Sequence, residues 1–345
     1  MSLFSFLKKQ DVAIDLGTTN VLVYVKDQGI VLNEPSVIAM ETGSKKIVAL
    51  GVEARNMLGR TPGNITAVRP LREGAIADYD ATSNMIQYFV KKVIGKNSFQ
   101  KPRIMMCIPS GVTDVERRAV LEATAEAGGG KVYLIEEPLA AALGAGIDIQ
   151  EPRGNMIIDI GGGTTDIAVL SLGGIVKSES IRVGGDRFDD SIVRYVKKEH
   201  NLLIGEQTAE KLKIQIGTAK LNGRSDSFDI RGRDLVSGLP RVIRMTSGDV
   251  YQAISESIGL IVGAVKLVLE TTPPELSADI IDRGIVITGG GALLHKIDQV
   301  ISEETGIPVV IAEDPLACVA LGSGKALDSL DILQEGIMQL RRRRR

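Results

Sequence analysis

Residues 12–25 read VAIDLGTTNVLVYV, and residues 156–170 repeat the same plan as MIIDIGGGTTDIAVL. In each stretch an apolar run ends on an aspartate, a turn of glycine and threonine follows, and a β-branched run returns. This pattern predicts a strand, a tight turn and a second strand. The two aspartates, Asp15 and Asp159, lie 144 positions apart, which is close to the length of one domain. We therefore expect two copies of one α/β unit that face each other across a cleft, rather than two unrelated hairpins.

The composition is that of a soluble protein with a buried core. The 345 residues suffice for two domains, and 44% of them are hydrophobic while 24% are charged. No apolar run approaches the roughly 18 residues of a membrane span, and Asp11 and Asp15 follow the first residues too closely for a secretory signal. Cys107 and Cys318 have no CxxC spacing, which argues against a disulfide framework or a structural zinc site. We therefore expect a cytoplasmic protein.

The basic residues are unevenly spread. The net charge is −2, although five arginines, Arg341–Arg345, close the chain. Proteins that bind nucleic acid usually carry a basic patch on the folded domain, so we expect no nucleic-acid partner. Near an anionic membrane each arginine of the tail could contribute on the order of 1 kcal/mol. A solvated tail is the alternative.

Strand and helix signals alternate along the rest of the chain. Strands are predicted at 104–108 and 132–135, and helices at 114–127, 138–144, 187–199, 209–216 and 247–269. Alternation of this kind indicates α/β domains in which helices pack on sheets. Two stretches, 35–70 and 222–244, are rich in turns and short strand signals. We interpret each as part of a small subdomain that caps one side of the cleft.

Both glycine turns offer backbone N–H groups and hydroxyls that can bind phosphate oxygens. The residues concerned are Gly17, Thr18, Thr19, Asn20, Gly161, Gly162, Gly163 and Thr164. Asp15 and Asp159, at the strand ends, are placed to hold a hydrated Mg²⁺ rather than to touch anionic phosphates. One such motif is only moderately specific, but two of them, one domain apart, predict a clamp with one arm from each domain.

Two further motifs could complete such a site. Residues 285–294, IVITGGGALL, predict a strand, three glycines and a helix whose N-terminus suits a flat ring or a phosphate, with a tight packed turn as the alternative. The spacing matches neither GxGxxG nor a Walker loop. Residues 134–142, LIEEPLAAA, predict a strand and then a helix with Pro138 in its first turn. The two glutamates could favour the helix dipole, or one could orient a water for attack on a γ-phosphate.

Together these motifs resemble those of the superfamily of actins, DnaK-type chaperones and sugar kinases. Within it the chain resembles the MreB/Mbl family over nearly its whole length, through NEPSVIA (33–39), RPLREGAIADY (69–79) and IGEQTAEKLKIQIG (204–217). The resemblance implies an actin-like α/β fold, with two duplicated domains around a nucleotide cleft, and ATP or ADP with Mg²⁺ as ligands. The implied parts are a first core (1–34 and 71–150, with 321–345 packing back), its cap (35–70), a second core (151–188 and 245–320) and its cap (189–244).

The resemblance also assigns roles to positions that match the family's motifs. Glu137 would orient the attacking water with help from Thr164, while Asp15 and Asp159 would hold Mg²⁺ through water. Further nucleotide contacts, besides the two turns, would come from Gly185, Asp186, Glu210, Lys213, Gly289, Gly290, Gly291 and Ala292. Without the resemblance, Glu210 and Lys213 would be interpreted as an i, i+3 pair on a helix surface.

Both ends of the chain carry apolar clusters. The first consists of Leu3, Phe4, Phe6 and Leu7. Two lysines follow it, and this combination suits shallow insertion at an anionic membrane, with a frayed terminus or a short packed helix as the alternative. The second consists of Leu330, Leu333, Ile337 and Leu340. Their helical spacing predicts a helix that docks on the first domain.

The resemblance implies an ATPase that forms filaments of its own copies at the inner face of the cell membrane. Such a protein would organise cell-wall synthesis and rod cell shape together with the cell-wall elongation machinery. A DnaK-like or sugar-kinase-like ATPase without polymerisation is the alternative. A chaperone would need a substrate-binding domain after the nucleotide domain, and a kinase would need a segment dedicated to an acceptor pocket. We find neither segment in the sequence, and therefore favour the filament.

Overall fold

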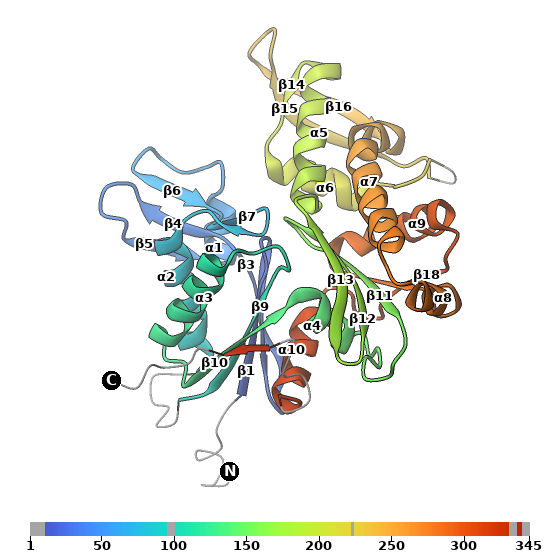
Figure 1. Cartoon of the computed structure of the whole chain (residues 1–345). Coiled ribbons are helices and arrows are strands. Elements are labelled where there is room, and N and C mark those ends of the chain that lie inside the picture. The colour runs from blue at the N-terminus through green and yellow to red at the C-terminus, as the bar shows by residue number, and fades with distance from the viewer. Residues whose placement is uncertain (1–10, 95–100, 222–223, 331–336, 340–345) are drawn as a thin grey trace.

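The computed structural model describes residues 11–94, 101–221, 224–330 and 337–339. Figure 1 shows two halves, each built on its own sheet, that meet along the middle of the molecule. A six-stranded sheet organises the first half, and a five-stranded sheet organises the second. The repeated stretch of sequence forms the antiparallel hairpin at the centre of each sheet.

The sheet of the first half has the strand order β19-β10-β9-β1-β2-β3. Its strands are β1 (Asp11–Leu16), β2 (Asn20–Val25), β3 (Gly29–Pro35), β9 (Arg103–Ile108), β10 (Lys131–Glu136) and β19 (Ile337–Gln339). Strand β1 pairs antiparallel with β2 and parallel with β9. The central strands are buried on both faces, which explains why they read as unbroken apolar runs.

Helices cover both faces of this sheet. They are α2 (Tyr79–Ile94), α3 (Asp114–Glu126), α4 (Glu137–Gly144) and α10 (Cys318–Asp328). Val12 and Ile14 point to the face where α2 supplies Phe89, whereas Ala13 points to the face where α4 supplies Leu139. The cluster around α4 and α10 also contains residues of the second sheet. These two helices therefore form the packed seam between the halves.

The sheet of the second half repeats this arrangement in the order β13-β12-β11-β17-β18. Its elements are β11 (Asn155–Ile160), β12 (Thr165–Ser171), β13 (Gly174–Ile181), β17 (Ile285–Thr288), β18 (Val309–Ile311), α5 (Gly185–His200), α6 (Glu206–Ile216), α7 (Ser247–Glu270), α8 (Pro274–Arg283), α9 (Ile297–Thr305) and the 3₁₀ helix η2 (Gly290–Leu293). Strand β11 pairs antiparallel with β12 and parallel with β17, as β1 does with β2 and β9. The duplicated sequence thus has a duplicated local topology.

Each half carries a small additional sheet beside the cleft. In the first half this sheet contains β4 (Ile38–Glu41), β5 (Ile47–Leu50) and β6 (Ile65–Val68), with α1 (Val52–Met57) packed on it and the short pair β7 (Leu71–Arg72) and β8 (Ala75–Ile76) following in the chain. In the second half it contains β14 (Leu202–Leu203), β15 (Ser227–Asp234) and β16 (Pro240–Thr246). Figure 1 shows the β15–β16 hairpin at the upper end of the second half.

The C-terminal segment differs from the sequence prediction. Residues 337–339 form strand β19, which pairs antiparallel with β10 at the edge of the first sheet. The prediction of a helix is therefore wrong at these residues, because the unpaired edge of β10 offers backbone hydrogen bonds that apolar spacing does not reveal. Leu330 and Ile337 both pack against the seam of α4 and α10. Leu333 and Leu340 lie outside the described residues.

Among the described helices, α7 alone is long and apolar enough to cross a membrane by length and composition. Its apolar side chains instead form much of the core of the second half, where Val250, Ile254, Ile261 and Val265 are fully buried. A long helix with a buried apolar stripe is expected in a core.

Candidate functional site

A cleft of about 530 Å³ lies between the two halves. Most residues that the sequence nominated line it, namely Asp15, Gly17, Thr18, Thr19, Asn20, Glu137, Asp159, Gly161, Gly162, Gly163, Thr164, Gly185, Glu210, Lys213, Gly289, Gly290 and Gly291. Two nominated residues are not part of its wall. Ala292 is fully buried in the core of the second half, and Asp186 lies behind Thr19, whose hydroxyl donates to it over 3.4 Å.

The two glycine turns are in contact across the cleft. A Cβ on Gly162 would overlap the side chain of Thr19, and one on Gly163 would lie 2.6 Å from the Thr18 hydroxyl. Glycine is therefore required at both positions by the approach of the other turn. The second turn is closed by the Gly161 N–H, which donates to the Thr164 carbonyl over 2.9 Å. The two glycine turns, one from each half, thus meet in the cleft, as the repeat in the sequence predicted.

Three carboxyls with little exposure to solvent, those of Asp15, Glu137 and Asp159, line the cleft. Burial raises the pKa of Asp15 to about 7, and the charge of Asp159 adds to the shift. Burial likewise raises the pKa of Asp159 to about 7, against the opposing effect of a hydrogen bond from Thr288. Burial, and then the charge of Asp166, raise the pKa of Glu137 well above its usual range. No basic side chain contributes to these three shifts, so a bound cation would relieve the repulsion.

The arrangement of these carboxyls can be tested against a Mg²⁺ site. Among the described residues, no three His, Cys, Asp or Glu side chains converge closely enough to ligate a metal directly. Mg²⁺, however, usually keeps several waters and takes only one or two carboxylates. The Thr288 hydroxyl donates to Asp159 over 2.9 Å and fixes its orientation. The residues present therefore fit a hydrated Mg²⁺ held through water by Asp15 and Asp159.

The third glycine cluster is a tight packed turn rather than a helix N-terminus. Gly289 has a φ of +81°, and a Cβ there would overlap the Ile160 carbonyl at the end of β11. Gly291 is equally close to the Ile160 side chain. The glycines lead into the four-residue 3₁₀ helix η2, and a regular helix begins only at Ile297. The expected helix start is thus wrong, because packing on β11 dictates these glycines.

Helix α5 is anchored to the second turn by its first N–H groups. Gly185 N–H donates to the Gly161 carbonyl over 3.0 Å, and Asp186 N–H donates to the Gly162 carbonyl over 2.8 Å. Lys213, on α6, donates to the Gly185 carbonyl and to Asp189, each over 2.9 Å. Lys213 is therefore fixed beside the N-terminus of α5, which is itself bonded to the second glycine turn.

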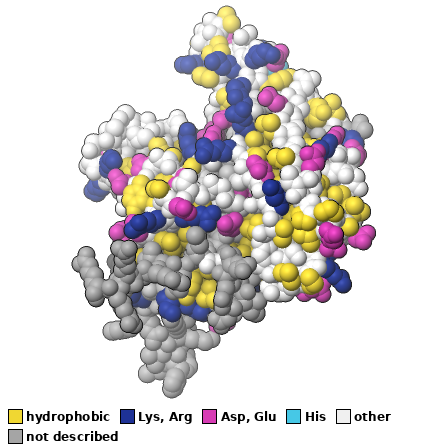
Figure 2. All heavy atoms as spheres, in the orientation of Figure 1, with side chains coloured by type: hydrophobic (Ala, Val, Ile, Leu, Met, Phe, Trp, Pro, Cys, Tyr) yellow, Lys and Arg dark blue, Asp and Glu magenta, His cyan; other side chains and the backbone are white. Residues whose placement is uncertain are grey.

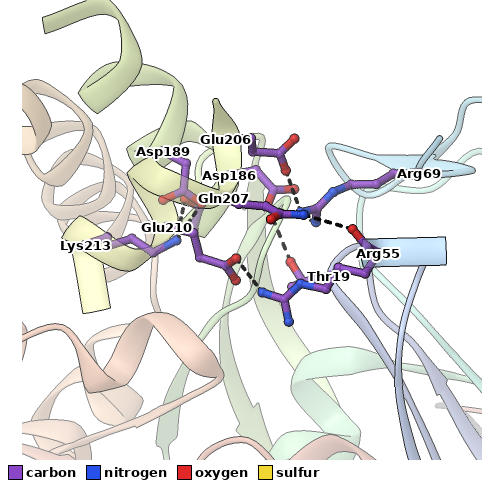
Figure 3. A network of polar contacts seen from close by, with 10 residues as sticks. Thr19, Arg55, Arg69, Asp186, Asp189, Glu206, Gln207, Glu210 and Lys213 are labelled. Carbon is purple, nitrogen blue, oxygen red and sulfur yellow. Dashed lines mark hydrogen bonds and ion pairs between the residues drawn. The ribbon is translucent and has the colours of Figure 1, made fainter. Parts of the chain in front are cut away.

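Three ion pairs and one hydrogen bond cross the cleft above the turns, as Figure 3 shows. Arg55 of α1 pairs with Glu210 of α6 over 2.5 Å. The Gln207 amide donates to the Arg55 carbonyl over 2.9 Å. Arg69, which follows β6, pairs with Glu206 over 2.5 Å and lies 3.5 Å from Asp186. Glu210 therefore pairs with Arg55, whereas Lys213 contacts Gly185 and Asp189. The two side chains are thus not an i, i+3 pair on a helix surface.

Sequence reasoning missed these crossing contacts, because Arg55 and Glu210 are 155 positions apart and neither belongs to a glycine motif. The only signal was that Arg69 opens the family-type stretch 69–79. It also missed three exposed apolar side chains of the cleft wall, Ile214, Leu293 and Leu316. They are suited to cover the faces of a planar ring. The apolar cluster at residues 3–7 lies outside the described residues.

The sequence matches the family model described as MreB/Mbl protein over residues 9–335. It is 56% identical over 324 residues to the cell shape-determining protein Mbl of Bacillus subtilis (strain 168), an alignment that covers 94% of this chain and 97% of the relative. The chain belongs to the MreB/Mbl family. It is also 52% identical over 335 residues to the cell shape-determining protein MreB of Escherichia coli (strain K12), with 95% and 96% covered. The family predicted from the motifs is thus confirmed.

Solved structures of MreB/Mbl family proteins share the fold. The structure of MreB5 of Spiroplasma citri bound to AMPPNP has a TM-score of 0.89 at 41% identity and covers 94% of this chain and 97% of that chain. The ADP-bound structure of the same protein has a TM-score of 0.90 at 40% identity, with 95% and 99% covered. A MamK double helical filament matches with a TM-score of 0.80 at 19% identity, which concerns the fold alone. The predicted actin-like α/β fold is confirmed.

Proposed function

We propose that this MreB/Mbl family member binds ATP with Mg²⁺ between its two glycine turns, hydrolyses it, and polymerises into filaments that organise cell-wall synthesis and cell shape. The observation that carries the proposal is that both turns meet in one cleft above the carboxyls Asp15 and Asp159. It is supported by relatives that are named cell shape-determining and by a relative that binds AMPPNP and ADP.

The chemistry is divided among the residues of the cleft base. Asp15 and Asp159 would hold Mg²⁺ through water, and the ion would supply positive charge to neutralise the phosphate oxygens. Thr18, Thr19 and the N–H groups of the second turn bind and orient the phosphates. Glu137, with Thr164, orients the water that attacks the γ-phosphate in line. Because Glu137 and the carboxyls around it are buried, little bulk water competes for this position.

The other end of the cleft holds the nucleoside in this proposal. Glu210 and Lys213 flank the ribose and base from α6, and Gly289 to Gly291 form the opposite wall. Ile214 and Leu293, which are 64% and 59% exposed, cover the faces of the adenine ring. Asp186 and Ala292 lie behind the wall and act by positioning Thr19 and η2.

The membrane part of the proposal rests on composition. Leu3, Phe4, Phe6 and Leu7 form an apolar cluster with lysines behind it, which suits a peripheral position at the inner face of the membrane. The cell-wall elongation machinery is the expected partner there. The division into two cores and two caps remains our proposal for the domain organisation.

Sedimentation and phosphate release with purified full-length chain test the proposal. ATP and Mg²⁺ should produce pelletable filaments with phosphate release, and vesicles containing anionic lipid should recruit them. A Phe4→Ser, Phe6→Ser variant should still assemble but lose the vesicles. Monomers under every condition, together with transfer of phosphate to a metabolite, would instead identify a sugar-kinase-like enzyme.

A further inference from the structure

His295 and Arg224 line the part of the cleft around Gly217, the residue that follows α6. Both belong to the second half. They differ in this from the basic and acidic side chains that Figure 2 shows beside one another where the two halves meet. Recognition of a ligand by His295 and Arg224 therefore does not depend on contacts between the halves.

Helix α6 gives this part of the cleft its place relative to a bound nucleoside. Glu210, Lys213, Ile214 and Gly217 all line the cleft. An α-helix rises 1.5 Å per residue, so Gly217 lies about 10 Å along the axis from Glu210. With the ribose beside Glu210 and the ring between Ile214 and Leu293, the ring edge remote from the ribose points toward Gly217. This is the edge that distinguishes one purine from another.

The hydrogen bonds of Thr218 decide which nitrogen of His295 carries the proton. The Thr218 hydroxyl is buried and lies 2.9 Å from His295 Nδ1. Its shortest contact is with the Lys220 carbonyl, to which it donates over 2.7 Å, and it accepts from the Lys220 N–H over 3.3 Å. A hydroxyl has only one proton to donate, so Nδ1 must be the donor to Thr218. With the proton thus assigned to Nδ1, His295 Nε2 can only accept.

The surroundings keep this imidazole neutral. Burial, and then the positive charges of Arg224 and Lys296, lower the pKa of His295 below its usual value. Asp226 and Asp298 raise the pKa, with a smaller effect. A neutral imidazole has one N–H donor and one acceptor nitrogen, so the acceptor character of Nε2 persists at neutral pH.

Three backbone acceptors around His295 are already used within the protein. Arg224 donates to the Gly217 carbonyl over 2.7 Å and also to the Gln215 carbonyl. The Ala219 N–H donates to the His295 carbonyl over 2.8 Å. In the described part of the chain no hydrogen bond reaches His295 Nε2. This nitrogen is therefore an acceptor that remains for a ligand in the cleft.

We propose that His295 selects adenine over 6-oxopurines, because its Nε2 accepts a hydrogen bond from the 6-amino group of the base. The inference rests on the proposed nucleotide site and deepens it. Adenine presents an amino donor at this position, whereas guanine presents a carbonyl acceptor. Two acceptors that face each other leave both without a hydrogen bond, which weakens binding. Thr218 is a positioning residue, since it fixes the proton on Nδ1.

Arg224 is the one feature here that could favour a carbonyl oxygen instead. Its guanidinium is already engaged, because Nε donates to Asp226 over 2.8 Å and the two terminal nitrogens donate to the Gly217 and Gln215 carbonyls. These bonds hold Arg224 against the end of α6. The acceptor on His295 is therefore the stronger influence on the choice of base.

Competition of ADP or IDP against a fluorescent ADP analogue, with Mg²⁺, measures the preference. IDP has a carbonyl where ADP has the 6-amino group, and it lacks the 2-amino group of guanine, so it isolates this edge of the ring. The unmodified chain should bind ADP at least about tenfold more tightly than IDP. Equal affinities would overturn the inference, and so would tighter binding of IDP, which would give the choice of base to Arg224.

An exchange of the acceptor for a donor should remove this preference. His295→Lys places a group there that only donates, so IDP should bind at least as tightly as ADP. The matched control is His200→Lys, the same exchange at the other histidine, which ends α5 and does not line the cleft. This control should keep the preference for ADP. A His295→Lys chain with the full preference would contradict the role of Nε2.

The positioning role of Thr218 has its own test. Thr218→Val removes the acceptor for Nδ1–H and should bring the affinities for ADP and IDP closer together, whereas Thr218→Ser retains the hydroxyl and should keep them apart. Nitrogen-15 NMR of the histidine rings reports the tautomer directly, and in the His200→Lys chain the remaining signals belong to His295. We expect the proton on Nδ1 and a shift of the Nε2 signal when ADP binds. A proton on Nε2 would overturn the inference.

The failure of this inference differs from failure of the proposed function. If the unmodified chain releases phosphate and pellets with ATP but binds ADP and IDP equally, only the role of His295 is wrong. If neither ADP nor IDP displaces the fluorescent analogue and ATP yields no phosphate, the nucleotide site itself is wrong, and the role of His295 falls with it.

Discussion

At the scale of single residues, the role of a carboxylate with little solvent exposure depends on whether a basic side chain lies beside it. Asp11 is 5% exposed and pairs with Arg103, whose Nε donates over 2.8 Å. Such a pair is a structural link between β1 and β9. Asp15, four residues later on the same strand, has no basic group among the causes of its raised pKa. That difference within one strand distinguishes a candidate cation site from an ordinary ion pair.

The first prediction concerns Glu137, whose burial and acidic neighbours raise its pKa. Glu137→Gln keeps the size of the side chain and removes the carboxylate that orients water. We expect phosphate release to fall by about 10²–10⁴-fold, the range typical for loss of a general base. The affinity for ATP and the extent of assembly should persist, because neither needs the carboxylate. Glu136→Gln, at the preceding and less buried position, is the matched control. Equal activity in both variants would exclude Glu137 from the reaction.

At the scale of elements, the seam of α4 and α10 depends on two glycines. A Cβ on Gly322 would overlap the Ala140 carbonyl, and one on Gly144 would overlap the Cys318 carbonyl. Gly322→Ala should therefore lower the free energy of unfolding by about 1–3 kcal/mol, the usual cost of overpacking. Gly263→Ala in α7, where a Cβ meets open space, should instead raise it by about 0.5–1 kcal/mol. Urea unfolding measures both, and equal effects would contradict the close packing.

A second prediction at this scale concerns the contacts that cross the cleft. The Arg55–Glu210 pair has side chains that are 39% and 16% exposed, so it should contribute no more than about 1 kcal/mol. Arg55→Ala should therefore speed ADP release by about two- to fivefold, because the cleft opens more easily. Lys45→Ala breaks an exposed pair with Asp80 within the first half and should leave release unchanged. Stopped-flow displacement of a fluorescent nucleotide measures the rates, and a difference of zero would contradict a role in closure.

The elements of the fold could be predicted where the sequence pattern is local. Residues 12–25 and 156–170 form the two hairpins, and the strand and turn signals that predict each hairpin all lie within that same short stretch of sequence. Strand β19 could not be predicted, because it depends on the free edge of β10, about 200 residues earlier. The glycines at 289–291 were nominated correctly as part of the cleft, but their packing on β11 has no local signature. The Arg69 contacts were likewise hidden, since they join segments that meet only in the folded chain.

At the scale of the whole molecule, the two halves are connected at two levels with the cleft between them. The seam of α4 and α10 connects them on one side, through tightly packed apolar residues. The ion pairs of Arg55 and Arg69 connect them on the other side, through partly exposed charges. The first connection is hard to change and the second is easy to break. We therefore expect domain closure to be a rotation about the seam, favoured by a nucleotide that both turns bind.

The last prediction concerns the pH dependence of the chain in EDTA without nucleotide. Burial raises the pKa values of Asp15, Asp159 and Asp189 to about 7, whereas an unfolded aspartate titrates near about 3.9. Between these values the folded chain binds protons that the unfolded chain has lost. The free energy of unfolding should therefore fall as the pH rises through this window, and level off above about 7.

Thermal unfolding measures this dependence directly. The melting temperature in EDTA should fall between pH 5 and pH 7, and Mg²⁺ with ADP should reduce the fall because the cation favours the ionised form of Asp15 and Asp159. An Asp15→Asn, Asp159→Asn variant should show a shallower slope in EDTA and little response to Mg²⁺. A melting temperature that rises with pH in EDTA would mean that these carboxyls are stabilised in their ionised form by the protein itself. In that case the cation would not be what completes the cleft.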